Sequence, residues 1–347
     1  MASYVITGVS KGLGFEFLRQ ISADSNNTVI GIVRDKPTTD KKVSEELSGR
    51  SNVHILQADV TDYNALEQAV AETARITGGS LDYLIANAGY VSWFDAFDPI
   101  GDLGNKPREL EEDLNKGIKV NVTANIHLFN LYMPLILKGQ VKKVIAISSG
   151  LADLDSITKF ELEPAPLYSI SKAALNIAVA KFHAQYKKDG VLFISISPGV
   201  ADVGHYNHIT QEQLQRLGGM MQKFKLFAPD FKGPTTPELA VKDVISVWKR
   251  ASVENGDGGT FVSHKGNKEW LAAVDGLYQE SNVPDEIVLD RVAFLALPLR
   301  PQLVSGRRSR AIVRRGSPGP QSSVPKAFKR SSVAKTVAYG WTPNPTA

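Results

Sequence analysis

A tyrosine and a lysine four residues apart, Tyr168 and Lys172, form the pair in this sequence with the most specific chemistry. On a helix, side chains four residues apart lie on the same face. A tyrosine has an ordinary pKa of about 10, and an ammonium group about 4 Å away supplies about the 4 kcal/mol needed to make it an acid near neutral pH. Such spacing also arises by chance, but this pair lies on a predicted helix after the fifth predicted strand. It could protonate a carbonyl oxygen as hydride reaches the carbon.

A glycine-rich turn follows the first apolar strand. Gly8, Gly12 and Gly14 lie between the predicted strand Tyr4–Thr7 and the predicted helix Gly14–Ala23. Glycine allows the backbone to turn tightly and to approach phosphate oxygens without a Cβ in the way. The N-terminus of the following helix offers free N–H groups and the positive end of a dipole. This arrangement predicts a site for a dinucleotide pyrophosphate.

The end of the second predicted strand indicates which dinucleotide is preferred. Enzymes that prefer NAD usually have an acid there, bonded to the ribose 2′-hydroxyl. Here Thr28–Val33 is followed by Arg34 and then Asp35, and Lys11 lies within the glycine turn. Two cations could neutralise a 2′-phosphate, which favours NADP(H). Two alternatives stay open: both cations are solvated surface residues, or Asp35 binds the ribose as in NAD enzymes.

Polar residues follow several of the other predicted strands. Asp59 could receive the adenine amino group, and Asn87 could pack near the adenosine ribose. Ser149, or its neighbour Ser148, could hydrogen-bond a substrate carbonyl and the developing alkoxide. Asn121, within a predicted helix, could hold a water that links the lysine to solvent. The structural alternatives are an ordinary Ser-Ser-Gly turn and a satisfied helix asparagine.

Short apolar runs alternate with amphipathic segments along most of the chain. Continuous apolar strands indicate burial on both faces, as in a parallel sheet covered by helices. We therefore predict an α/β fold with a single doubly wound parallel sheet, whose ligands bind beyond the carboxyl ends of the strands. The predicted strands are Tyr4–Thr7, Thr28–Val33, Val53–Gln57, Leu81–Ala86, Lys143–Ile147, Leu192–Ser197 and Thr260–Val262. The predicted helices are Gly14–Ala23, Asn64–Thr77, Leu110–Leu137 and Leu167–Tyr186.

Three long connections interrupt this alternation. Tyr90–Lys116 and Leu151–Pro166 could form walls of a pocket. The third, Ala201–Pro237, is rich in large apolar residues. It is either a helix pair packed on the core or an apolar lid over a bulky substrate. Its large apolar residues are Met220, Met221, Phe224, Phe227 and Phe231.

Composition limits the function classes. The chain has 347 residues, 43% of them hydrophobic, which is enough for a sizeable core. The absence of cysteine excludes disulfides, thiolate metal sites and a cysteine nucleophile. We find no signal peptide and no apolar run near the ~20 residues of a membrane span. We therefore expect a cytoplasmic protein without a membrane partner.

The net charge of +4 conceals an asymmetry. Residues 1–290 contain 29 Lys and Arg against 36 Asp and Glu, whereas residues 291–347 contain 11 Lys and Arg and no acid. The body is therefore acidic, and we expect no nucleic-acid partner. The basic Ser- and Pro-rich tail, 291–347, has a composition typical of disorder. A targeting or anion-binding segment and an error in gene prediction are the alternatives.

The order of these motifs resembles the short-chain dehydrogenase/reductase family over residues 3–270. Within it, the segment Thr28–Asp35 is similar to ketoreductases related to norsolorinic acid ketoreductase and to sniffer-type carbonyl reductases. The resemblance implies a Rossmann fold for residues 1–275, including the lid 201–237, with 276–290 as a boundary region before the tail. The motifs are Thr7-Gly8-x-x-x-Gly12-x-Gly14, Asp59, Asn87-Ala88-Gly89, Asn121, Ser149, Tyr168-x-x-x-Lys172 and Pro198-Gly199.

The resemblance also implies roles for individual residues. Tyr168 is the proton donor, Lys172 binds the nicotinamide ribose and lowers the tyrosine pKa, Ser149 polarises the carbonyl, and Asn121 completes the proton relay. Val200 contacts the carboxamide. The implied NADP(H)-binding residues are Gly8, Ser10, Lys11, Gly12, Leu13, Gly14, Arg34, Asp59, Val60, Asn87, Ala88, Gly89, Tyr168, Lys172, Pro198, Gly199 and Val200.

We accordingly predict NADPH-dependent reduction of a ketone or aldehyde to an alcohol, with a small-molecule carbonyl substrate that is bulky and aromatic or polyketide-derived, in secondary metabolism. An NADP-dependent alcohol dehydrogenase working oxidatively and a non-catalytic NADP(H)-binding sensor or scaffold are the alternatives. The family implies a homodimer or homotetramer. Three departures from its pattern are the long connection between Ser149 and Tyr168, Asp202 in place of a frequent threonine, and the basic tail.

Overall fold

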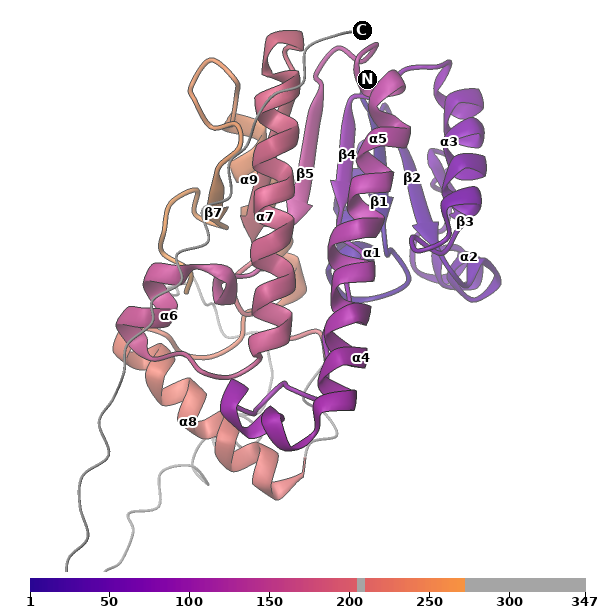
Figure 1. Ribbon diagram of the computed structural model, residues 1–347. Coiled ribbons are helices and arrows are strands. Elements are labelled where there is room, and N and C mark those ends of the chain that lie inside the picture. Colours follow the sequence, from indigo (N-terminus) through magenta and orange to yellow (C-terminus); the bar gives the residue numbers. More distant parts are fainter. Residues whose placement is uncertain (205–209, 272–347) are drawn as a thin grey trace, which may run out of the picture. The chain divides into compact units, whose positions relative to one another are not determined.

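Seven parallel strands form one sheet in the computed structural model, which describes residues 1–204 and 210–271 (Figure 1). Their order is β3-β2-β1-β4-β5-β6-β7. All described residues belong to the compact unit Met1–Leu295, and the unit Ala296–Ala347, with the predicted tail, lies outside them. The strands are β1 (Ser3–Thr7), β2 (Thr28–Val33), β3 (Val53–Gln57), β4 (Tyr83–Ala86), β5 (Lys143–Ile147), β6 (Leu192–Ser197) and β7 (Phe261–Ser263).

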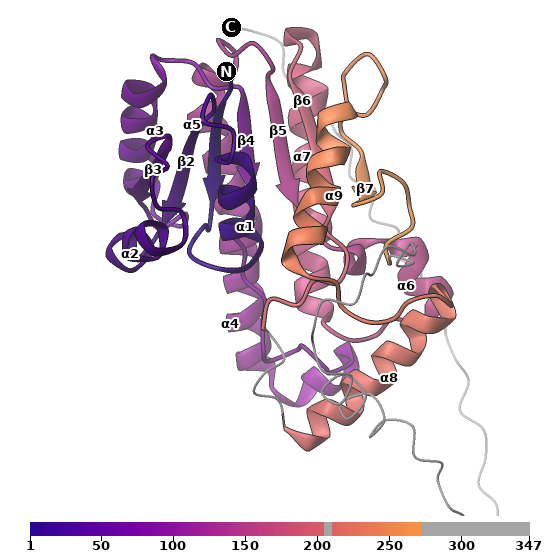
Figure 2. The same ribbon diagram turned by 180° about the vertical axis from the view of Figure 1, so that it is seen from behind.

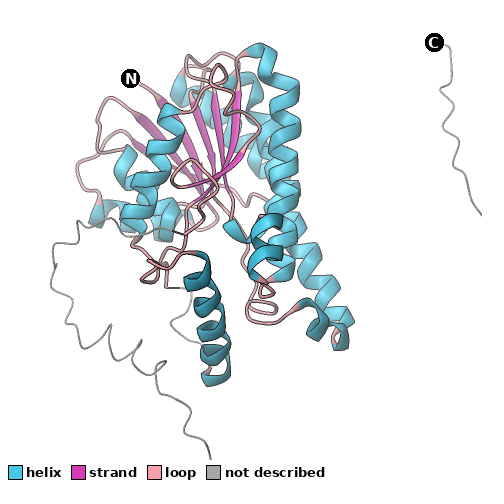
Figure 3. Cartoon of the chain, turned by 90° about the vertical axis from the view of Figure 1, so that its left-hand side faces the viewer, coloured by secondary structure: helices cyan, strands magenta, loops and turns pink. Residues whose placement is uncertain are grey.

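Helices cover both faces of the sheet. Figure 1 shows α3, α5 and α7 in front of it, and Figure 2 shows α1 and α9 on the opposite face. Figure 3 shows the strands lying between these helical layers. The helices are α1 (Gly12–Ile21), α2 (Lys36–Glu46), α3 (Tyr63–Thr77), α4 (Pro107–Ile118), α5 (Ala124–Ile136), α6 (Leu154–Phe160), α7 (Pro166–Tyr186), α8 (Gln211–Phe227) and α9 (Pro237–Arg250). The predicted doubly wound parallel sheet is thus confirmed.

Each face of the sheet has its own apolar core. Successive side chains of a strand point to opposite faces. Tyr4 and Ile6 of β1 therefore pack in the cluster that includes α1 and α9, whereas Val5 packs in the cluster that includes α3, α5 and α7. The direction of the strand order reverses between β1 and β4, and in doubly wound sheets ligands bind beyond the carboxyl ends of the strands at such a point.

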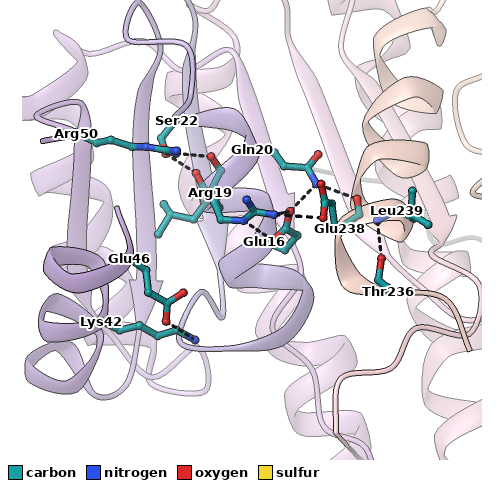
Figure 4. A network of polar contacts seen from close by, with 11 residues as sticks. Glu16, Arg19, Gln20, Ser22, Lys42, Glu46, Arg50, Thr236, Glu238 and Leu239 are labelled. Carbon is teal, nitrogen blue, oxygen red and sulfur yellow. Dashed lines mark hydrogen bonds and ion pairs between the residues drawn. The ribbon is translucent and has the colours of Figure 1, made fainter. Parts of the chain in front are cut away.

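Polar contacts hold α1 against α9 (Figure 4). Arg19 donates to the carboxylate of Glu16 at 2.7 Å and lies 3.9 Å from the carboxylate of Glu238 on α9. Gln20 donates to the main-chain carbonyl of Glu238 at 2.9 Å. Arg50, before β3, donates to the carbonyl of Arg19. These contacts fix the axis of α1, whose N-terminus adjoins the glycine turn.

Some helices differ from the prediction. The expected single helix Leu110–Leu137 consists of α4, a π-helical turn η2 (Lys119–Thr123) and α5. Such single turns are rare and have no residue pattern of their own, so the sequence did not predict this one. The helices α2, α6 and α9 were not predicted, and α8 lies in the segment Ala201–Pro237, for which a helix pair was one alternative. The helix α2 buries only Thr39 and has no apolar stripe. Within the described ranges, no helix has the length and apolar character needed to cross a bilayer.

The packing of α9 generates a stability prediction. Trp248 is 1% exposed, and its ring lies 5.4 Å from that of Phe17 on α1. We expect Trp248→Ala to lower the free energy of unfolding by about 3–5 kcal/mol, because it removes the largest side chain of this core. Urea unfolding followed by circular dichroism measures the change. The control is Leu239→Ala on the same helix, where the side chain is 38% exposed. Equal stability of the two variants would contradict the packing.

Candidate active site

A cavity of about 230 Å³ lies at the carboxyl ends of β5 and β6. Ser149, which follows β5, and Tyr168, on α7, both line it. Two residues of the predicted cofactor motif after β6, Gly199 and Val200, also line it. The other lining residues are Val91, Gly150, Leu151, Ser156, Leu162, Ser197, Ala201, Val203, Met220, Phe224, Trp270 and Leu271.

Lys172 brings a buried amine to the predicted proton donor. Its Nζ lies 5.8 Å from the centroid of the Tyr168 ring and donates to the main-chain carbonyl of Ile147 at 2.8 Å. Only 4% of Lys172 is exposed, and burial lowers its pKa to about 8. The amine is therefore still largely protonated at neutral pH but loses its proton far more readily than a surface lysine. The sequence-predicted pair is thus side by side in the fold.

The structure distinguishes the two candidate serines. Ser149 lines the cavity, and its Oγ accepts a hydrogen bond from the backbone N–H of Leu151 at 3.3 Å. Ser148 is 3% exposed, does not line the cavity, and its Oγ has no hydrogen-bond partner within the described part of the chain. A substrate carbonyl in the cavity can therefore meet the hydroxyl of Ser149 but not that of Ser148.

Asn121 lies in the π-helical turn η2 and is fully buried. Its Nδ2 donates to the carbonyl of Tyr90 and to Oγ of Ser171, both at 2.9 Å, and its Oδ1 accepts from the N–H of Tyr90 at 2.7 Å. A Cβ added to Gly89 would lie 3.3 Å from this Oδ1 and 3.5 Å from Nζ of Lys172. Asn121 therefore joins the segment after β4 to α7, beside the lysine. Its role in a proton relay stays a prediction.

The glycine turn has the geometry expected of a phosphate cradle. Gly8 and Gly12 have φ angles of +76° and +57°, a region that side chains disfavour. A Cβ on Gly14 would lie 2.0 Å from the carbonyl oxygen of Gly8, so no other residue fits there. Lys11 precedes α1 and provides no side-chain cap. The first N–H groups of α1 are therefore left for an anion, and the turn fits a dinucleotide pyrophosphate.

Asn87 and Ala88 tie the end of β4 to this turn. The Asn87 side-chain amide donates to the carbonyl of Thr7 at 2.9 Å. The backbone N–H groups of Asn87 and Ala88 donate to Oγ1 of Thr7 at 3.1 and 2.9 Å. Asn87 therefore supports the shape of the turn, and its contact with a ribose stays a prediction.

The two cations and the carboxylate near the end of β2 differ in their contacts. Arg34 and Lys11 are exposed, and neither forms an ion pair within residues 1–204 and 210–271. Asp35, by contrast, caps α2, because its carboxylate accepts from the N–H of Thr38 at 3.1 Å. Hydrogen bonds from Thr38 lower the pKa of Asp35. The two cations are thus available to a ligand, while the acid is engaged.

The remaining predicted cofactor residues lie around the same edge of the sheet. Asp59 accepts two hydrogen bonds from Thr61 at 2.8 Å. Burial raises the pKa of Asp59, but the bonds from Thr61 and the nearby Arg34 outweigh this, so that its pKa lies below the ordinary value. Ser10 is exposed, Leu13 and Val60 pack against the two cores, and Pro198 is buried.

The predicted lid segment, 201–237, contributes α8 to the cavity wall. Met220 and Phe224 line the cavity, and both belong to a third apolar cluster with Phe231. The apolar residues of the segment are therefore packed in a cluster and line the cavity at the same time. Arg216 of α8 pairs with Asp98. Whether the segment opens and closes stays a prediction.

Trp270 is a cavity residue that the sequence motifs did not single out. Its indole N–H donates to the carboxylate of Asp153 at 3.1 Å, and its ring stacks on Phe261 at 4.4 Å. A Cβ on Gly150 would lie 2.8 Å from the Trp270 Cβ, so the glycine makes room for the tryptophan. In the sequence, the one feature that points to this part of the cavity wall is an isolated tryptophan after the last strand.

Comparison with known proteins assigns the family. The family model for short chain dehydrogenases matches residues 3–214. The short chain dehydrogenase virK of Hypocrea virens is 69% identical over 271 residues, which cover 78% of this chain and 100% of the relative. The short-chain dehydrogenase/reductase iacC of Pestalotiopsis fici is 55% identical, with 78% and 100% covered. The chain therefore belongs to the short-chain dehydrogenase/reductase family, and the predicted family is confirmed.

Solved structures agree on the fold. The NADPH-bound carbonyl reductase from chicken fatty liver aligns with a TM-score of 0.61 at 22% identity, covering 79% of this chain and 99% of that one. The carbonyl reductase Sniffer of D. melanogaster aligns with a TM-score of 0.59 at 20% identity, covering 77% and 98%. At these identities the likeness establishes the Rossmann-type architecture and nothing more about this chain.

The buried amine predicts a pH-dependent stability. The Lys172 pKa is about 8 in the folded protein against 10.5 ordinarily, so between these pH values the unfolded chain binds more protons at this residue. Its contribution to the free energy of unfolding therefore rises with pH in that window, by up to about 1.4 kcal/mol per pH unit. Urea unfolding of the wild type and of Lys172→Met, from about pH 7.5 to 10, measures the contribution of Lys172 to the free energy of unfolding. Identical pH profiles for the two proteins would contradict the burial of a titrating amine.

Proposed function

We propose that this protein reduces a ketone or aldehyde to an alcohol with NADPH, and that Tyr168 donates the proton. The observation that carries the proposal is the shared position of three groups: Ser149 and Tyr168 line one cavity, and Nζ of Lys172 is buried 5.8 Å from the Tyr168 ring. A hydroxyl, a phenol and a buried amine together can polarise a carbonyl and deliver a proton to its oxygen.

Each residue then has a distinct task. Ser149 hydrogen-bonds the carbonyl oxygen, and the phenol of Tyr168 transfers its proton to that oxygen as negative charge develops on it. The ammonium of Lys172 favours the phenolate that remains, because opposite charges stabilise each other in a site with little water. Asn121, which is fixed beside Lys172, forms part of the relay through which Tyr168 regains its proton. NADPH, when bound, supplies the hydride.

The preference for NADPH is supported by the charges at the end of β2. Arg34 and Lys11 are exposed beside the glycine turn, while the carboxylate of Asp35 is occupied as the cap of α2. Two available cations suit a 2′-phosphate, and a capping acid is less available to a ribose hydroxyl. The chicken carbonyl reductase of similar fold is described as NADPH-bound.

The cavity favours an apolar substrate of some bulk. Its walls include Met220, Phe224 and Trp270, and its polar side chains are those of Ser149, Ser156, Tyr168 and Ser197. Such a lining suits an aromatic or polyketide-derived ketone of secondary metabolism, oriented by its carbonyl. The same residues serve oxidation of the alcohol, so an alcohol dehydrogenase is the alternative direction. A cytoplasmic location, a homodimer or homotetramer, and a catalytic domain ending near residue 275 belong to the proposal on family grounds.

The central test is a screen of ketones as substrates for the wild type and for Tyr168→Phe, which lacks the phenol hydroxyl. We expect the wild type to oxidise NADPH with bulky aromatic ketones, and Tyr168→Phe to lower kcat by on the order of 100-fold or more, because only the proton donor is lost. Fluorescence titration should give an NADPH dissociation constant within about threefold of the wild type. Tyr63→Phe, on the exposed surface of α3, is the control. A Tyr168→Phe enzyme with undiminished kcat would overturn the assigned chemistry, and binding of NADPH without turnover of any ketone would favour a sensor.

The cofactor preference has its own test. We expect Arg34→Asp to shift the ratio of kcat/KM for NADPH over NADH toward NADH by about 10-fold or more, because it replaces a cation by an acid where a 2′-phosphate would lie. Lys41→Asp, which makes the same charge change at an exposed position of α2, is the control. A ratio that moves no more in Arg34→Asp than in the control would show that Arg34 is a surface residue only.

A further inference from the structure

The N-terminus of α7, which carries Tyr168, has no cap of its own. The residue before the helix is Ala165, whose side chain cannot accept a hydrogen bond, and the first helical residue, Pro166, has no N–H to satisfy. Two backbone donors, those of Leu167 and Tyr168, therefore need acceptors from elsewhere. These are the N–H groups that a capping Ser, Thr or Asp at position 165 would ordinarily serve.

Asp95 provides the missing acceptor from a segment 72 residues away. Its Oδ2 accepts from the N–H of Leu167 at 2.7 Å and from the N–H of Tyr168 at 3.3 Å. Its main-chain carbonyl accepts from the N–H of Ala165 at 3.0 Å. Asp95 is 0% exposed. One buried residue thus accepts three backbone N–H groups at the start of α7: that of the residue before the helix, that of the residue before the tyrosine, and that of the tyrosine itself.

The backbone at this point is also strained. Ala165 has a φ of +57°, in the left-handed region, which is unfavourable for a non-glycine residue. Such conformations persist only where their surroundings hold them, and they concentrate at functional sites. The hydrogen bond from Ala165 to the Asp95 carbonyl is one of the contacts that hold it. The same segment closes the long connection between Ser149 and Tyr168.

The segment that carries Asp95 is itself anchored. Asn121 binds both the N–H and the carbonyl of Tyr90, and the Tyr90 hydroxyl donates to the carboxylate of Asp113 at 2.6 Å. Ser92 donates to the same carboxylate oxygen at 2.8 Å and accepts from the N–H of Phe94 at 2.9 Å. A continuous set of hydrogen bonds therefore runs from the π-helical turn to the residue before Asp95.

We propose that Asp95 is a positioning residue: it sets the start of α7 and thereby the place of the Tyr168 hydroxyl in the cavity. The inference rests on the proposed function. A purely structural role explains the arrangement less well, because Oδ1 of Asp95 is buried without a partner within the described part of the chain, and a bare buried carboxylate oxygen is costly. A local cap at position 165 would satisfy the same helix without that cost.

The test compares two replacements of Asp95 with a matched cap. Asp95→Ala removes the acceptor, and Asp95→Asn keeps an oxygen for the two N–H groups. Asp62→Ala removes the equivalent cap of α3, where Asp62 accepts from the N–H of Ala65 at 3.1 Å, far from the cavity residues in sequence. We expect Asp95→Ala to lower kcat by about 10- to 100-fold, since small misplacements of a catalytic group cost that much. Asp95→Asn should recover kcat to within about threefold, and Asp62→Ala should leave it unchanged.

A second readout separates this inference from the proposed function. Amide hydrogen exchange of a peptide spanning residues 161–175 should accelerate in Asp95→Ala and return toward the wild-type rate in Asp95→Asn. The NADPH dissociation constant should stay within about threefold, because the glycine turn is untouched. Unchanged exchange, or a kcat no lower than that of Asp62→Ala, would overturn the positioning role. A further outcome is that the wild type reduces no ketone while amide exchange still accelerates in Asp95→Ala and returns toward the wild-type rate in Asp95→Asn. In that case the proposed function would fail, and the control of the start of α7 by Asp95 would stand.

Discussion

The burial of one amine beside a phenol is the constraint on which the site depends. Lys172 reaches its place only because α7 packs against the sheet at the end of β5, where the carbonyl of Ile147 accepts a hydrogen bond from its Nζ. A charge with so little water around it is tolerated when it has a hydrogen-bond acceptor and when a neighbouring group gains from it. The sheet therefore does more than support the cavity: its strand end holds the lysine.

A second constraint operates at the glycine turn after β1. The glycine turn is packed so closely that the position of Gly14 leaves no space for a Cβ, and Thr7 binds the chain after β4 through its hydroxyl. The end of β1, the start of α1 and the end of β4 consequently form one rigid unit. The contacts between α1 and α9 extend that rigidity to the far layer of helices. A bound dinucleotide would meet a surface that is already shaped, which limits the entropy lost on binding.

Local patterns were sufficient to predict most of the fold and the central residues of the site. Each strand is a short apolar run, and the glycine turn and the Tyr168–Lys172 spacing are contained within a few residues, so the sequence alone locates them. The π-helical turn at Asn121 escaped prediction because a single turn of this kind has no residue pattern of its own. Asp95 and Trp270 escaped it for a different reason: their partners, Tyr168 and Asp153, are 73 and 117 residues away, and no local spacing encodes such contacts. What the sequence conceals here is the set of long-range contacts that hold the predicted groups in place.

Two segments outside the sheet form part of the cavity wall, and this bears on how such a protein can diversify. Asp153 receives hydrogen bonds from Ser156 and Trp270, so the segment after β5 and the segment after β7 are joined to each other through a single carboxylate. Neither segment contributes a strand to the sheet. Exchanges in these two segments can therefore alter the outline of the cavity together, while the strands, the glycine turn and the lysine are inherited unchanged. A protein of this architecture could therefore acquire new substrates through substitutions in these two segments, which lie outside the sheet.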